Sequence, residues 1–141
     1  MRQILLCEDN EADIFLVRYA LSTHQIEHEL HLVTDGDQAI EFVNRMGKPD
    51  GPPCPDIFLL DMNLPKADGI EVLRECRKQS QSRQTPVIVM SSSVILRDKA
   101  IMEELRVSYY FRKPSELEAF LKLGSIVLEI LTNAHHVPIL M

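Results

Sequence analysis

A continuous apolar run from Ile57 to Leu60 that leads directly into Asp61 constrains the fold more than any other stretch of the sequence. Pro65 and Gly69 close the segment on its C-terminal side. A run this short fits a strand buried on both faces better than a helix, although periodicity alone does not decide between the two. An acid at the last position of such a strand lies where α/β sheets form their ligand crevice.

Short apolar runs and amphipathic stretches alternate along the rest of the chain. Because their apolar residues run continuously or alternate with polar ones, further strands are predicted at 4–7, 28–33, 85–90 and 109–112. Helices are predicted after each strand, at 10–21, 39–46, 70–78, 95–105 and 115–131. This alternation predicts an α/β fold in which right-handed crossovers wind helices over both faces of a parallel sheet.

Three local patterns bear on how the predicted helices begin and pack. Asn10, followed three residues later by Asp13, predicts the N-cap of the first helix. The stretch from Ser115 to Glu118 has the pattern of a capping box and predicts that the last helix is capped at Ser115. Gly124 inside that helix costs about 1 kcal/mol relative to alanine, so we expect close packing or a bend there.

The bulk properties argue against several classes of protein. A chain of 141 residues fits one domain, which we expect to span 1–134, followed by a tail at 135–141. The net charge of −6 disfavours non-specific nucleic-acid binding, which relies on clustered Lys and Arg, and no stretch approaches the roughly 20 apolar residues that cross a bilayer. Cys7, Cys54 and Cys76 have neither disulfide-framework nor zinc-site spacing. We therefore expect a cytoplasmic protein with no nucleic-acid or membrane partner.

Polar residues stand at four predicted strand ends: Glu8 and Asp9, Asp61, Ser91 and Lys113. Parallel strands bring these ends to one edge of the sheet. Crowded carboxylates repel one another unless a cation balances them, and Mg²⁺ is a hard cation that takes oxygen ligands. A lysine and a hydroxyl beside them suit a phosphoryl oxygen. The set is typical of a phosphoryl-transfer site in which Asp61 is the nucleophile.

With these residues the chain resembles the receiver domains of two-component response regulators over essentially its whole length. The intervals of 30 residues from Asp61 to Ser91 and of 22 from Ser91 to Lys113 are similar to those of the family. The resemblance implies a five-stranded, doubly wound, flavodoxin-like fold. The segments that carry it are Glu8-Asp9-Asn10, Asp61 with Pro65 and Asp68-Gly69, Met90-Ser91-Ser92, and Tyr110-Phe111-Arg112-Lys113-Pro114.

The resemblance assigns the acidic residues to a phosphoacceptor site. It implies that Asp61 takes a phosphoryl group from a phosphohistidine of a sensor histidine kinase or of a phosphotransfer protein. It implies that Glu8 and Asp9 hold Mg²⁺, directly or through water, together with the Asp61 carboxylate and the backbone carbonyl of Asn63. No turnover of a small molecule is expected, so the chain is not predicted to be an enzyme in that sense.

The resemblance also implies a conformational switch. Lys113 would contact the acyl phosphate, and Ser91 would move to hydrogen-bond it. Tyr110 would change rotamer with Ser91 and alter the face formed by the fourth helix, the fifth strand and the fifth helix. The Lys113–Pro114 peptide bond is often cis in such proteins.

Within the family, the chain looks most like the stand-alone regulators that are paired with phytochrome kinases. In that subgroup there is no output domain, and homodimers form through the fourth helix, fifth strand and fifth helix. Arg112 departs from the family, because that position is usually apolar, and the tail 135–141 has no counterpart. The segments that are similar to the subgroup are 8–13, 34–36, 61–65 and 91–93.

Two other functions stay open on the sequence. A pseudo-receiver would keep the fold as an interaction module and never turn over phosphate, but no member of the phosphorylation set is missing. A hydrolase with an aspartyl nucleophile would have a second acid two residues after Asp61, whereas residue 63 is Asn.

Several apolar residues exceed what one core face of each late helix needs. They form a predicted patch for a partner or a second copy of the chain. The alternative is that they are core or scattered surface residues. The residues are Ile95, Leu96, Met102, Ile126, Ile130 and the tail from Val137 to Met141.

Overall fold

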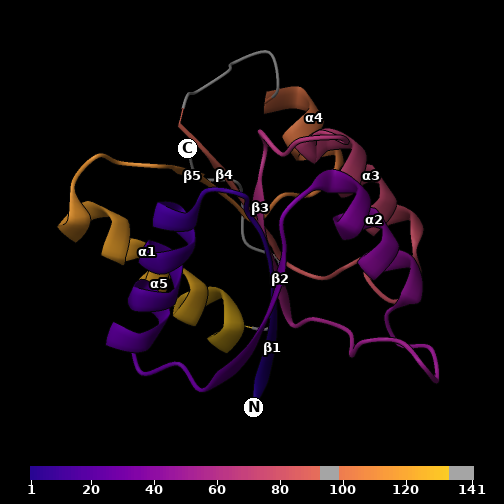
Figure 1. Ribbon diagram of the computed structural model, residues 1–141, viewed down its shortest axis with the longest axis horizontal. Coiled ribbons are helices and arrows are strands. Elements are labelled where there is room, and N and C mark those ends of the chain that lie inside the picture. The colour runs from indigo at the N-terminus through magenta and orange to yellow at the C-terminus, as the bar shows by residue number, and fades with distance from the viewer. Residues whose placement is uncertain (93–98, 134–141) are drawn as a thin grey trace.

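The computed structural model of the chain describes residues 1–92 and 99–133, in which five strands form one parallel sheet (Figure 1). No helix within these ranges is long and apolar enough to cross a membrane. The strands are β1 (Arg2–Cys7), β2 (His28–Val33), β3 (Ile57–Asp61), β4 (Val87–Ser91) and β5 (Tyr109–Arg112). The helices are α1 (Glu11–Thr23), α2 (Gly36–Arg45), α3 (Gly69–Lys78), α4 (Lys99–Glu104) and α5 (Leu117–Thr132).

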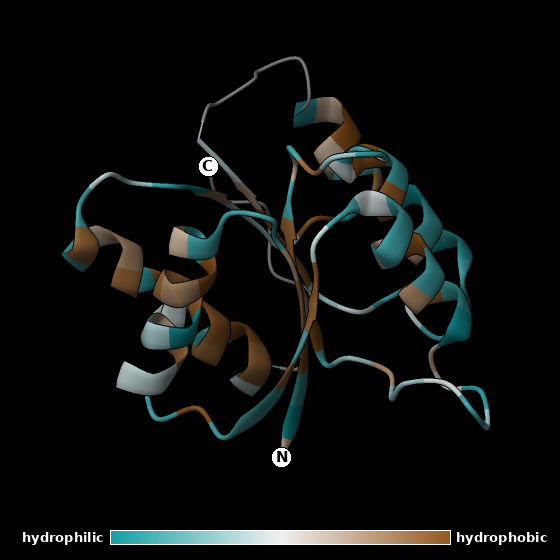
Figure 2. Ribbon diagram, viewed as in Figure 1, coloured by the Kyte–Doolittle hydropathy of each residue, from teal (hydrophilic) through white to brown (hydrophobic). Residues whose placement is uncertain are grey.

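Helices cover both faces of the sheet. α1 and α5 lie on one side, and α2, α3 and α4 lie on the other (Figure 1). Each face has its own hydrophobic cluster, one built around α1 and α5 and one around the other three helices. In Figure 2 the central strands are largely hydrophobic, whereas much of α2 and α3 is hydrophilic. The predicted α/β, doubly wound architecture is confirmed.

Strand β3 supplies side chains to both clusters. Phe58 and Leu60 belong to the cluster on the α2–α4 side, and Ile57 and Leu59 belong to the cluster on the α1–α5 side. All five residues of the strand are buried. This alternation is the period-two geometry of a strand, and it confirms that the apolar run is a strand buried on both faces.

The strand order is β2-β1-β3-β4-β5. The chain moves from β1 outward to β2 and then returns to place β3 on the other side of β1, so the winding direction reverses between β1 and β3. Parallel α/β sheets form their ligand crevice outside the carboxyl ends of the strands at such a reversal. Glu8 follows β1, and Asp61 ends β3, so both lie beside this point.

Gly124 lies where α5 crosses α1. A Cβ atom at this position would overlap the ring of His24 and the carbonyl oxygen of Ala20, both at the α1 side of the contact. The close packing expected at Gly124 is therefore found, and it explains why a residue with low helix propensity stands inside α5.

The beginning of α5 differs from the prediction. The helix starts at Leu117 with Glu116 as the N-cap, and the Glu116 side chain makes no capping hydrogen bond to the described residues. The backbone N–H of Phe120 donates to Glu116 O at 3.1 Å, so Ser115 lies one residue too early to cap the helix. The Lys113–Pro114 bond is trans, the form that X–Pro bonds favour by about 0.5–1 kcal/mol.

The predicted apolar patch is not formed by its described members. Met102 is 1% exposed and belongs to the core cluster on the α2–α4 side, whereas Ile130 is 5% exposed and belongs to the cluster on the α1–α5 side. Ile126 is partly buried against the cluster that contains Ile130. Ile95, Leu96 and the tail lie outside the described residues. The interpretation as core is therefore correct for Met102 and Ile130.

Candidate functional site

Asp61 is the last residue of β3, and its side chain is only 6% exposed. Oδ1 accepts a hydrogen bond from the backbone N–H of Asn63 at 2.9 Å. Oδ2 lies 3.1 Å from the Nζ atom of Lys113. Both carboxylate oxygens therefore accept a hydrogen bond.

Glu8 and Asp9 reach the same place from the end of β1. The backbone N–H of Glu8 still bonds to Val33 O at 3.0 Å, so the chain keeps a strand geometry up to this residue. One oxygen each from Glu8, Asp9 and Asp61 lies within 4.8 Å of the other two. Glu8 is fully buried and Asp9 is exposed, which gives the cluster a closed and an open side. Three carboxylates at this spacing are oxygen ligands of the kind that hard divalent cations bind.

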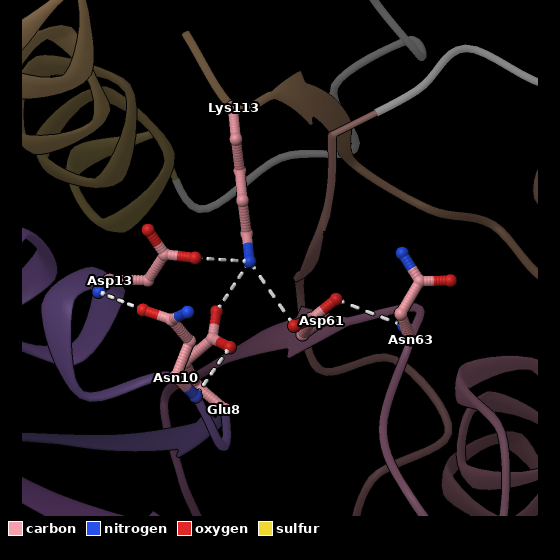
Figure 3. A network of polar contacts seen from close by, with 6 residues as sticks. All are labelled: Glu8, Asn10, Asp13, Asp61, Asn63 and Lys113. Atoms are coloured by element: carbon pink, nitrogen blue, oxygen red, sulfur yellow. Dashed lines mark hydrogen bonds and ion pairs between the residues drawn. The ribbon is translucent and has the colours of Figure 1, made fainter. Parts of the chain in front are cut away.

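Lys113 enters the crevice directly after β5. Its backbone N–H bonds to Ser91 O at 2.7 Å, which extends the pairing of β4 and β5 by one residue. The Nζ atom forms ion pairs with Glu8 Oε1 at 2.7 Å, Asp13 Oδ2 at 2.8 Å and Asp61 Oδ2 at 3.1 Å (Figure 3). The side chain is 9% exposed. An ammonium group has three N–H donors, and three carboxylates take them up.

Burial and neighbouring polar groups shift two pKa values in the crevice. Burial and the hydrogen bond to Asp61 raise the pKa of Glu8 to about 7, even though Lys113 lowers it. Burial by itself lowers the pKa of Lys113, but hydrogen bonds to Asp13 and Glu8 outweigh it, so this pKa lies above its ordinary value. Lys113 is therefore a cation, and without a metal Glu8 holds a proton for part of the time near neutral pH.

Sequence reasoning missed the carboxylate of Asp13 as a member of this network. Asn10 caps α1 as predicted, because its Oδ1 accepts from Asp13 N–H at 3.0 Å. The Asp13 side chain turns to Lys113, however, and Glu8 Oε2 accepts the Asn10 N–H at 3.2 Å. The capping pattern had assigned Asp13 only a role at the start of α1. Its place in the first turn after the Glu8-Asp9 strand end was the signal that could have found it.

Ser91 and Tyr110 lie on neighbouring strands. Ser91 is the last residue of β4 and is buried, and Tyr110 is buried in β5 on the side of α2, α3 and α4. Arg112, the residue that departs from the resemblance, ends β5 opposite Ser91 and is exposed. An exposed position tolerates a charge, so Arg112 does not disturb the core. The switching roles of Ser91 and Tyr110 stay predictions.

Comparison with known proteins gives a match that spans most of the chain. Residues 4–123 match the family of the response regulator receiver domain. Response regulator Rcp1 of Synechocystis sp. is 39% identical over 120 residues, which cover 85% of this chain and 82% of Rcp1. The Mn²⁺-bound crystal structure of Rcp1 superposes with a TM-score of 0.83 and 35% identity over 98% of this chain and 99% of that one.

Two further solved structures cover almost the whole chain. The phosphorylated cyanobacterial phytochrome response regulator RcpA is 33% identical, with a TM-score of 0.81 over 97% of this chain and 98% of its own. The receiver domain of a sensor histidine kinase of Pseudomonas aeruginosa, with magnesium in its active-site cleft, is 26% identical, with a TM-score of 0.73 over 94% and 98%. Both the predicted fold and the predicted family are confirmed.

Proposed function

The chain belongs to the family of response regulator receiver domains, and on that premise we propose that it accepts a phosphoryl group on Asp61 from a phosphohistidine of a sensor histidine kinase or phosphotransfer protein. In the transfer, a carboxylate oxygen of Asp61 bonds to phosphorus as the N–P bond breaks. The imidazole keeps the electron pair of that bond and takes up a proton. The observation that carries the proposal is the ion pair of Lys113 Nζ with Asp61 Oδ2 at 3.1 Å, beside the two acids after β1.

The chemistry of the donor set fits Mg²⁺. Glu8, Asp9 and Asp61 would hold the ion together with the backbone carbonyl of Asn63, since carboxylate and carbonyl oxygens are its usual protein ligands. When bound, Mg²⁺ would neutralise negative charge on the carboxylates and on the transferring phosphoryl group.

Lys113 and Ser91 would act on the phosphoryl oxygens. Of the three acids that Lys113 contacts, Asp61 is the most distant. The N–H group of Lys113 that now donates to Asp61 is therefore the one that would donate to a phosphoryl oxygen instead. A lysine there stabilises the charge that the phosphoryl group carries. Ser91 would donate its hydroxyl to the same group, and Tyr110 would follow its movement.

The signal would leave through protein contacts. We assign the phosphorylation-sensitive surface to α4, β5 and α5, where a homodimer could also form, and Leu117 and Leu128 are exposed on α5. Similarity to Rcp1 and to the phytochrome response regulator RcpA favours a phytochrome kinase as the phosphoryl donor. All three cysteines are free thiols, which suits a reducing cytoplasm. The domain would span 1–134.

A beryllium fluoride titration tests the proposal against the two other functions. With Mg²⁺ present, the fluoride complex is expected to bind at Asp61 as a mimic of the phosphoryl group, and ¹⁹F NMR reports the bound form. A pseudo-receiver would show no bound form at any Mg²⁺ concentration. A hydrolase would instead release phosphate from small phosphomonoesters over many turnovers. Either result would contradict the proposal that the chain is a phosphoacceptor.

Mg²⁺ binding is expected to depend on pH through Glu8. Because the pKa of Glu8 is about 7 without metal and a ligand carboxyl must be ionised, binding near pH 7 should release about half a proton. The affinity should rise as the pH increases from about 6 to about 8 and then level off. Calorimetry in two buffers of different ionisation enthalpy measures the proton release. An affinity that stays constant across this range would contradict the burial and charge assigned to Glu8.

A further inference from the structure

Asp13 is the acid in the crevice for which the proposed phosphoryl transfer has no role. In the described part of the chain it is not a member of the carboxylate group that a cation would bind, which comprises Glu8, Asp9 and Asp61. It nevertheless lies 2.8 Å from Lys113 Nζ, closer than Asp61 does. Among the interactions that raise the pKa of Lys113, the hydrogen bond to Asp13 is the largest.

The backbone of Asp13 is held in place by the start of α1. Its N–H is bound by the cap residue Asn10 at 3.0 Å, and Asn10 is in turn bound by Glu8 at 3.2 Å. The Asp13 side chain is 24% exposed, so water screens it less than a surface acid. Asp13 therefore presents a fixed negative charge to the ammonium group from the α1 side.

Asp13 and Asp61 approach the ammonium group from opposite sides (Figure 3). The contact between Lys113 and Asp13 is thus compatible with Lys113 directing another N–H toward a group bonded to Asp61. Asp13 would hold the lysine in position, while its negative charge offsets part of the lysine's positive charge. The same charge attracts a cation to the acidic cluster and opposes a phosphoryl anion.

We propose that Asp13 is a positioning residue that anchors Lys113 from α1, strengthens the binding of Mg²⁺ to the acidic cluster and weakens the binding of a phosphoryl group at Asp61. The inference rests on the proposed function, because it assigns Lys113 to the phosphoryl group. Asp13 thereby sets how readily the chain becomes phosphorylated at a given Mg²⁺ concentration. A residue that served only to start α1 would have no such pair of opposite effects.

Asp13→Asn is the variant that tests this role, because it removes the charge and keeps the size of the side chain. The dissociation constant for Mg²⁺, measured by calorimetry, is expected to rise roughly 3- to 10-fold. At saturating Mg²⁺, the dissociation constant for beryllium fluoride, measured by ¹⁹F NMR, is expected to fall by roughly the same factor. Asp13→Glu keeps the charge and is expected to leave both constants close to those of the wild type.

Glu11→Gln is the matched control. Glu11 is exposed in the same first turn of α1 and is not among the acids that Lys113 contacts in the described residues. The variant Glu11→Gln removes the same charge from the N-terminus of α1 as Asp13→Asn does. It therefore reproduces any loss of helix stability and any long-range effect of that charge. Neither constant should change by more than about 2-fold in this variant.

The outcomes separate the inference from the function on which it rests. Wild-type protein that fails to bind beryllium fluoride would overturn the phosphoacceptor function and the role of Asp13 with it. Normal wild-type binding, with Asp13→Asn indistinguishable from Glu11→Gln, would overturn the role of Asp13 alone. Weaker binding of both ligands in Asp13→Asn would also overturn it, because the net effect of Asp13 on the group bound at Asp61 would then be favourable. Opposite shifts in Asp13→Asn, absent from Glu11→Gln, support the inference.

Discussion

Replacing Lys113 with alanine is expected to slow phosphorylation of Asp61 by acetyl phosphate roughly 100-fold at saturating Mg²⁺, the usual cost of removing one charge-stabilising donor from an active site. The same variant should bind Mg²⁺ more tightly than the wild type. The reason is that the ammonium group contacts Glu8 and Asp61, two members of the proposed metal-binding set, at 2.7 and 3.1 Å. Rates from intact-protein mass spectrometry and Mg²⁺ affinity from calorimetry measure the two effects.

Lys122→Ala serves as the control for this variant. Lys122 is an exposed lysine of α5, so its removal changes the net charge of the protein without changing the crevice. A phosphorylation rate for Lys113→Ala that equals the rate for Lys122→Ala would show that Lys113 does not act on the phosphoryl group. Weaker Mg²⁺ binding by Lys113→Ala would contradict the competition between the ammonium group and the metal.

The second large effect is on stability and involves Arg77, at the C-terminal end of α3. Burial lowers the pKa of Arg77 to about 10, yet its guanidinium donates five hydrogen bonds to the backbone. These bonds join the loop that follows α3 to the turn between α4 and β5. Their acceptors are the carbonyl oxygens of Ser82, Arg83, Thr85, Leu105 and Arg106.

Arg77→Ala is expected to lower the free energy of unfolding by about 3 kcal/mol, because several partly buried carbonyl groups lose their donor at once. Urea denaturation monitored by circular dichroism measures the loss. Arg74→Ala is the matched control, since Arg74 is an exposed arginine one turn earlier in α3 and its loss should stay within about 0.5 kcal/mol. Equal midpoints for the two variants would contradict the role of Arg77 as a clamp on the backbone.

The sequence predicts what depends on the direction and spacing of strands. The apolar runs set β1 and β3, and parallel pairing then brings Glu8, Asp61 and Lys113 to one edge, because the residues that follow strands of one direction must meet there. The order of polar strand ends is what made the resemblance to the receiver family specific. Fold and family followed from the same pattern.

The sequence does not predict what depends on how a side chain turns at a helix terminus. Asp13 has the spacing of the acid in a capping pattern, but its carboxylate pairs with Lys113, one hundred residues later. Ser115 has the pattern of a cap, but α5 starts at Leu117, so its N-cap is Glu116, one residue beyond Ser115. Arg77 gave no signal, because all its partners are backbone carbonyls, which every residue carries.

The central claim is that Asp61 accepts the phosphoryl group, and identifying the phosphorylated residue tests it most directly. The protein is incubated with acetyl phosphate and Mg²⁺, and its intact mass gives the number of phosphoryl groups. Borohydride then reduces an acyl phosphate to an alcohol with release of phosphate, which converts a phosphorylated aspartate to homoserine that peptide mass spectrometry locates. We expect one phosphoryl group per chain before reduction and homoserine at position 61 after it, and neither product in Asp61→Asn. Wild-type protein that stays unmodified, or that carries the phosphoryl group at another residue, would contradict the claim.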